Sequence, residues 1–120
     1  MNAEELKKRT KEFAKETIYL FRNMPNTPET WVIGKQLLRS ATSVAANYRA
    51  VCRARSDQEF ASKIGVVVEE ADESAFWLEI MHETDFINTP ASQKLEKEAN
   101  ELVAIMNASR QSILKKLNRN

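Results

Sequence analysis

The sequence predicts an all-α protein: an antiparallel, up-down-up-down four-helix bundle in a single domain, residues 1–120. Only two Gly and three Pro occur in 120 residues, which leaves little material for the tight turns of a β-sheet. Apolar side chains recur at spacings of three and four residues along four long stretches, as they do on amphipathic helices. Short connections between four helices of similar length require neighbouring helices to run in opposite directions.

The first two helices are separated by a proline-containing break. The first helix is expected over residues 3–23. Its apolar seam is Leu6, Thr10, Phe13, Thr17, Leu20 and Met24. Thr27 is a good N-cap, and Pro28 is tolerated at a first helical position because that position needs no amide hydrogen. The second helix is therefore expected to start there and to continue to about residue 53.

The third and fourth helices have similar start signals. Ser56 followed by Glu59 forms a capping-box pattern, in which each side chain bonds the other residue's backbone amide. A helix is therefore expected over residues 57–84. Thr89 and Pro90 repeat the Thr-Pro start, so the fourth helix is expected over residues 90–117.

The two middle helices carry opposite charges on the faces that point away from their apolar seams. The row on the second helix is Lys35, Arg39, Thr42, Ala46, Arg49 and Arg53. The row on the third helix is Glu69, Asp72, Phe76, Glu79 and Glu83. Residues 25–55 have five cations and one anion, whereas residues 56–86 have one cation and nine anions. This segregation lies within a chain whose formal net charge is only +1.

Residues 36–49, which read QLLRSATSVAANYR, resemble the signature of a bacterial four-helix-bundle family, the 23S rRNA intervening-sequence proteins. Ser56, Phe60, Lys63 and the stretches 69–74 and 77–78 fit the same pattern in order and spacing. The resemblance implies a bundle that assembles into a ring-like homopentamer. It also implies kinship with accessory proteins of diversity-generating retroelements, whose partners include a reverse transcriptase and nucleic acid. It supplies no catalytic residues, and Ala50 stands where many members have Glu.

No pattern in the sequence indicates an enzyme, a metal or a cofactor. His82 is the only His, so the two Glu-x-x-His motifs of a di-iron bundle cannot form. Cys52 is the only Cys and has no His to act as its base. The chain has no Gly-rich phosphate loop. The sequence also has neither a signal peptide nor a membrane-length apolar run, and with its single Cys it is expected to be cytoplasmic.

Two further groups of residues are expected to have structural roles. The first is a buried polar network that fixes the register of the middle helices, with ligand binding as the alternative; its members are Gln36, Ser40, Ser43, Asn47 and Glu70. The second is a set of aromatic residues that anchor a subunit interface, with scattered surface aromatics as the alternative. Its members are Trp31, Phe76 and Trp77.

The basic row of the second helix has two interpretations, which the sequence leaves open. One is a nucleic-acid surface on which phosphate contacts add up around an oligomer. Its candidate residues are Lys35, Arg39, Arg49, Arg53, Arg55, Lys115 and Lys116. The other is a protein–protein scaffold without a nucleic-acid role, in which the basic row meets the acidic row of a neighbouring subunit. The near-neutral pI of about 7.8 counts against the first interpretation, because dedicated nucleic-acid binders are usually far more basic, but it does not decide between the two.

Overall fold

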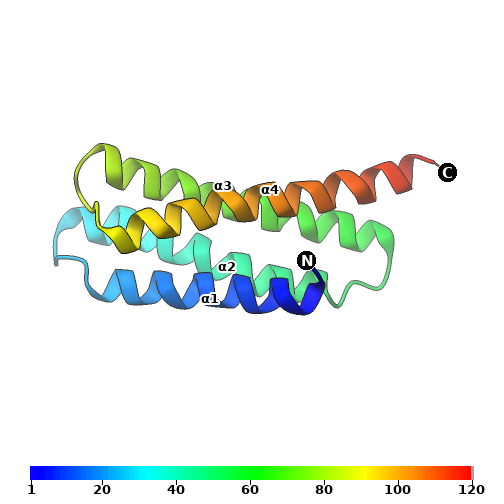
Figure 1. Cartoon of the computed structure of the whole chain (residues 1–120), viewed down its shortest axis with the longest axis horizontal. Coiled ribbons are helices and arrows are strands. Elements are labelled where there is room, and N and C mark those ends of the chain that lie inside the picture. Colours follow the sequence, from blue (N-terminus) through cyan, green and yellow to red (C-terminus); the bar gives the residue numbers. More distant parts are fainter. Residues whose placement is uncertain (120) are drawn as a thin grey trace.

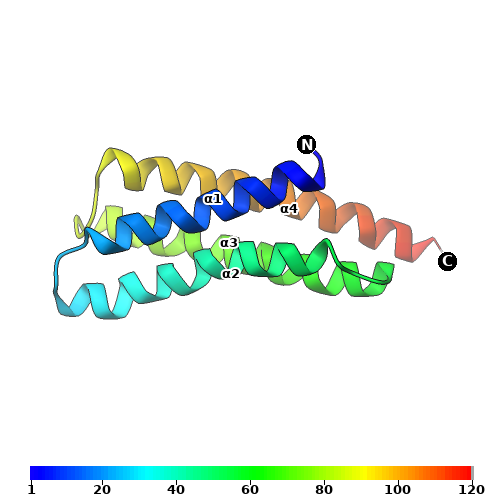
Figure 2. The same cartoon turned by 90° about the horizontal axis from the view of Figure 1, so that it is seen from below.

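The computed structural model of the chain describes residues 1–119 and contains four long α-helices. These are α1 (Ala3–Arg22), α2 (Lys35–Val51), α3 (Asp57–Glu83) and α4 (Pro90–Asn118), with a short π-helical segment, η1 (Thr30–Gly34), directly before α2. Residues 1–119 contain no strand. The helices lie side by side along the long axis of an elongated molecule measuring 52 × 23 × 22 Å (Figures 1 and 2).

The chain passes along the long axis four times, and the connections alternate between the two ends (Figure 1). Contacts between α3 and α4 fix their relative direction. His82, in the last turn of α3, contacts Ser92 in the first turn of α4. Asp57, the first residue of α3, is 3.0 Å from the ammonium group of Lys116 near the end of α4. Consecutive helices pack against each other, and α1 also contacts α4.

The predicted helix ends differ from those in the structure by at most two residues, except at the start of the second helix, which was expected at residue 28, whereas α2 begins at Lys35 after η1. At the start of α3, Ser56 Oγ accepts a hydrogen bond from the Glu59 amide at 3.0 Å. The return bond of the predicted capping box does not form among the described residues, because the Glu59 carboxylate lies toward Arg55, 4.0 Å from its Nε. A complete capping box occurs instead at the start of α4, between Thr89 and Ser92.

The π-helical segment η1 is a feature that the sequence analysis did not predict. Its last residue, Gly34, is buried against the end of α1. A Cβ added at Gly34 would lie 3.0 Å from Met24 Sδ and 3.3 Å from Phe21 Cε2. Glycine therefore permits a close approach between η1 and the end of α1.

The core runs the length of the bundle and contains side chains from all four helices. Its largest fully buried apolar side chains are Phe13, Leu37, Val44, Ile64, Val67, Leu78, Met81, Leu102 and Met106. On α2, the residues at helical spacing from Leu37 to Val51 are all buried; they are Leu37, Ala41, Val44, Tyr48 and Val51. None of the described helices has the length and apolarity needed to cross a membrane.

Candidate nucleic-acid interface

A basic surface lies between the first half of α1 and the last half of α2. An open groove of about 530 Å³ has Ala45 and Ala46 in its lining, together with five cations and one carboxylate, Glu4. A neighbouring depression of about 410 Å³ shares two of these cations and adds two more, with Glu59 as its single carboxylate. We call the combined surface the basic face; its cations are Lys7, Lys8, Lys11, Arg49, Arg53, Arg55 and Lys63.

Helical spacing explains why these cations gather on one surface. Lys7 and Lys11 are four residues apart on α1, as are Arg49 and Arg53 on α2, so each pair lies one above the other on its helix. The alanines between the two helices are short. Long cationic side chains can therefore extend along both sides of an open groove.

Most cations of the basic face have no anionic partner within the chain. Lys7 is 2.9 Å from Glu4, and Arg55 is 4.0 Å from Glu59. The ion pairs among residues 1–119 include none of the other five, which are Lys8, Lys11, Arg49, Arg53 and Lys63. The face therefore carries a surplus of positive charge in a chain that is almost neutral overall.

The structure separates the nucleic-acid candidates predicted from the sequence. Arg49, Arg53 and Arg55 lie on the basic face. Lys35 instead extends over the ring of Trp31, with its ammonium 5.4 Å from the ring centroid. Lys115 is exposed in the last turn of α4, and Lys116 in the same turn pairs with Asp57.

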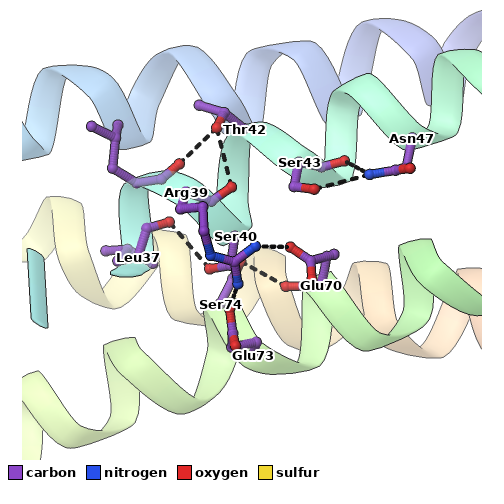
Figure 3. Close-up of polar contacts among 10 residues, drawn as sticks. Leu37, Arg39, Ser40, Thr42, Ser43, Asn47, Glu70, Glu73 and Ser74 are labelled. Atoms are coloured by element: carbon purple, nitrogen blue, oxygen red, sulfur yellow. Dashed lines mark hydrogen bonds and ion pairs between the residues drawn. The ribbon is translucent and has the colours of Figure 1, made fainter. Parts of the chain in front are cut away.

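Arg39 is the candidate whose environment differs most from the expected one. Its guanidinium pairs with Glu70 at 2.9 Å and also with Glu73, both on α3 of the same chain (Figure 3). The predicted basic row therefore divides into a neutralised part at Arg39 and an unpaired part at Arg49 and Arg53. Both acidic partners of Arg39 in the structure belong to its own chain.

Sequence reasoning missed the contribution of α1 and α3 to the basic face. Lys7, Lys8 and Lys11 come from the run KKRTK at residues 7–11, and Lys63 is on α3. The run was a usable signal, but the first helix as a whole has a mixed charge. Only the packing of α1 beside α2 brings these lysines next to Arg49 and Arg53.

The residues proposed for a buried polar network form two separate groups and leave one member out. Ser40 is fully buried, and its Oγ is 2.9 Å from Ser74 Oγ on α3 (Figure 3). The Asn47 side-chain amide donates to both Ser43 Oγ and the Ser43 carbonyl oxygen at 2.9 Å.

Two of the five proposed network residues correct the prediction. Gln36 is exposed, because its side chain points outward from α2 instead of toward α3. The Glu70 carboxylate bonds Arg39, and only the Glu70 backbone carbonyl reaches the buried Ser40–Ser74 pair, through Ser74. Ser74 was not among the predicted network residues, but its hydroxyl takes the place that the prediction gave to the Glu70 side chain.

The three aromatic candidates have different exposures. The side chains of Trp31 and Phe76 are 59% and 48% exposed. The Trp31 indole Nε1 donates to Asn26 Oδ1 at 2.9 Å. Trp77 is half-buried against the core and lies edge-on to Phe76, with ring centroids 5.0 Å apart. Trp77 therefore supports Phe76, which is the more exposed of the two.

One cluster has the connectivity of a catalytic triad. His82 lies between two partners: its Nδ1 is 2.5 Å from Glu96 Oε1, and its Nε2 is 2.8 Å from Ser92 Oγ. Ser92 is fully buried, and its hydroxyl also bonds the amide and carbonyl of Thr89. A substrate cannot reach this hydroxyl in the observed structure. The contacts of the cluster instead connect the end of α3 to the start of α4.

No group of three or more His, Cys, Asp or Glu side chains among residues 1–119 is placed to hold a metal ion.

Comparison with known proteins identifies the family. The model of the 23S rRNA-intervening sequence protein family matches residues 3–108. The chain belongs to this family. A solved structure described as a protein of unknown function from the S23 ribosomal protein family of Bacteroides thetaiotaomicron is 29% identical to it, with a TM-score of 0.79. The similarity covers 87% of this chain and 96% of the other. A search of curated proteins finds no match.

Proposed function

We propose that this chain is a non-enzymatic nucleic-acid-binding protein that holds the phosphate backbone of structured RNA or DNA on its basic face. The observation that supports this proposal is the gathering of seven cations around a groove containing alanine, with only Glu4 and Glu59 as carboxylates. Five of the cations have no anionic partner among the described residues. The name of the family, which refers to 23S rRNA, agrees with a nucleic-acid ligand.

The composition of the basic face favours phosphate contacts over base recognition. Phosphate contacts provide affinity and orientation, whereas sequence is recognised at base edges or by stacking on aromatic rings. The linings of the groove and depression include no aromatic side chain. We therefore expect binding that depends strongly on salt and weakly on sequence.

We further propose that these up-down-up-down bundles assemble into a ring-like homo-oligomer, a pentamer as the family resemblance implies. Exposure of Trp31 and Phe76 supports this proposal, because large aromatic side chains are common anchors of protein interfaces. Assembly would repeat the basic face once per subunit. Phosphate contacts that are weak in one subunit would then add up along a single nucleic acid.

The test is a binding titration with structured RNA and duplex DNA at about 50 and 200 mM salt, where electrostatic binding changes by orders of magnitude. Wild type is compared with Arg49→Glu/Arg53→Glu and with the control Lys15→Glu/Lys35→Glu, which reverses two exposed cations outside the basic face. We expect the first variant to lose most of its affinity and to have a shallower salt dependence. The control should keep the wild-type salt dependence.

Binding that is equal in all three proteins and independent of salt would contradict the proposal. The protein–protein scaffold would then be the function that accounts for the charged faces. The acidic outer row of α3 is the observation that favours this second candidate, since four of its carboxylates have no cationic partner among the described ion pairs. These carboxylates are Glu69, Asp72, Glu79 and Glu83.

A further inference from the structure

An apolar groove runs between α1 and α4, on the other side of α1 from the α1–α2 groove, with Lys8 in the lining of both grooves. It has a volume of about 1130 Å³. We call it the acceptor groove; its large apolar lining residues are Phe13, Tyr19, Leu20, Met24, Ile87 and Leu95. Phe13 and Leu95 are buried, whereas Leu20, Met24 and Ile87 remain half-buried. The lining therefore offers apolar surface that the bundle itself does not cover.

The polar contacts between α1 and α4 are concentrated at one residue. Arg9 makes all the side-chain hydrogen bonds and ion pairs that join these two helices among residues 1–119. Its guanidinium is 2.6 Å from Glu98 Oε1 and 2.9 Å from Glu101 Oε2. Beyond this bridge, toward Met24 and Ile87, no polar side chain draws the two helices together.

The α4 side of the acceptor groove carries unpaired positive charge. Lys94 and Lys97 line the groove, are exposed, and take part in none of the ion pairs of the described chain. The carboxylates Glu98 and Glu101 on the same side are held by Arg9. On the α1 side, Glu12 pairs with Lys15, whereas Glu5, Lys8 and Glu16 take part in none of the described ion pairs, so the surplus of positive charge is confined to the α4 side.

The outer face of α3 has the complementary character. Phe76 is 48% exposed, and its helical neighbours Asp72 and Glu79 lie four residues before it and three residues after it. Neither carboxylate has a cationic partner among the described residues. Contact of Glu79 with Glu83, through a hydrogen bond and repulsion, raises the pKa of Glu79. On this face the exposed Phe76 ring is flanked by carboxylates, and the Trp77 ring packs edge-on against it.

We propose that the outer face of α3 in one copy docks into the acceptor groove of a second copy. Phe76 enters the apolar floor, while Asp72 and Glu79 meet Lys94 and Lys97. This inference rests on the proposed homo-oligomer and specifies its interface. The basic face is a poorer acceptor for Phe76, because the apolar residues that line it are all alanines apart from Cys52.

The proposed contact joins two different surfaces, so it is heterologous. Each copy would have one outer face of α3 and one acceptor groove, which generates a closed ring or an open chain. A buried Phe contributes on the order of 150–250 Å² to an interface, enough for a central anchor. The residues assigned to the contact do not line the α1–α2 groove, which stays available for nucleic acid.

The first experiment measures the mass of the full chain in solution by sedimentation equilibrium. We expect wild type to be an oligomer and Phe76→Ala to be a monomer with an unchanged circular dichroism spectrum. The control Leu114→Ala truncates another exposed apolar side chain, at the far end of α4, and should remain an oligomer. If both variants remain oligomers, the docking inference is wrong while the homo-oligomer stands. A monomeric wild type would defeat the homo-oligomer itself.

The second experiment uses charge reversal to test the pairing of the two surfaces. Asp72→Lys/Glu79→Lys and Lys94→Glu/Lys97→Glu should each be monomeric, because like charges meet at the interface. Mixing the two variants should produce complexes heavier than the monomer, since the unchanged α3 face of one variant meets the unchanged groove of the other. Because the two variants must alternate, these complexes cannot be closed rings with an odd number of copies. Both variants forming wild-type oligomers, or a mixture that stays monomeric, would overturn the inference.

Discussion

Leu37 and Arg39 are two residues apart on α2, and their environments are opposite. Leu37 is fully buried in the core. Arg39 is 51% exposed and pairs with Glu70 and Glu73. We predict that Leu37→Ala lowers the free energy of unfolding by about 2–5 kcal/mol, because it leaves a cavity. Arg39→Ala should cost less than about 1 kcal/mol, because solvent weakens exposed ion pairs. Urea denaturation midpoints in the opposite order would contradict this assignment of the two faces.

Tyr48, again a single residue, leads to a prediction about how stability changes at alkaline pH. Burial, with a further effect from the adjacent Cys52, raises the pKa of Tyr48 to about 12. The ordinary value of about 10 applies to the unfolded chain. Between about pH 10 and 12 the unfolded chain therefore loses the phenolic proton while the folded chain keeps it, which lowers the free energy of unfolding as pH rises. This contribution to stability is fully present only below about pH 10.

The measurement for Tyr48 is the urea midpoint of wild type and of Tyr48→Phe at pH 8 and pH 11. Phenylalanine cannot ionise, so the variant should lose less stability than wild type over this interval. Tyr19→Phe makes the same change at an exposed position and should preserve the wild-type dependence on pH. Equal losses in wild type and Tyr48→Phe would show that the ionisation of Tyr48 does not affect folding.

At the scale of the element, the start of α3 depends on a single side-chain cap. Ser56 Oγ accepts from the Glu59 amide, and the reciprocal bond is absent among the described residues. We predict that Ser56→Ala lowers the free energy of unfolding by about 0.5–2 kcal/mol, the usual cost of losing such a cap. Ser62→Ala is the matched control. Ser62 is exposed inside the same helix, where Ala is favoured over Ser. Thermal denaturation should therefore rank Ser56→Ala below Ser62→Ala.

The sequence was most informative about elements and least informative about contacts between them. The starts of α3 and α4 follow from local signals, Ser56 and the Thr89–Pro90 pair, which act within one turn of a helix. The η1 segment depends on the packing of Gly34 against Phe21 and Met24, which a local pattern does not contain.

The candidate site shows the same limit. Arg49 and Arg53 were predicted from their spacing on one helix. Lys7 and Lys11 belong to a different helix and join them only through tertiary packing. The neutralisation of Arg39 depends on the position of α3, which sequence spacing alone could not show.

At the scale of the whole molecule, the charges form separate surfaces within a chain of nearly zero net charge. The basic face lies over α1, α2 and the start of α3. Four anions that take part in none of the described ion pairs lie together on the outer face of α3, around Phe76: Glu69, Asp72, Glu79 and Glu83. A net charge of +1 therefore conceals one surface suited to phosphates and another suited to cations of a neighbouring copy.

This separation allows assembly and nucleic-acid binding to be tested independently. Phe76→Ala leaves both the charge and the basic face unchanged. If the ring holds several basic faces on one ligand, the variant should bind a long structured RNA on the order of 100-fold more weakly than wild type. A short duplex that spans a single basic face should bind both proteins almost equally. Fluorescence anisotropy at a fixed salt concentration measures both affinities, with Leu114→Ala as the control. Equal weakening for the long and short ligands would mean that Phe76 affects the basic face directly, contrary to the separation of surfaces argued here.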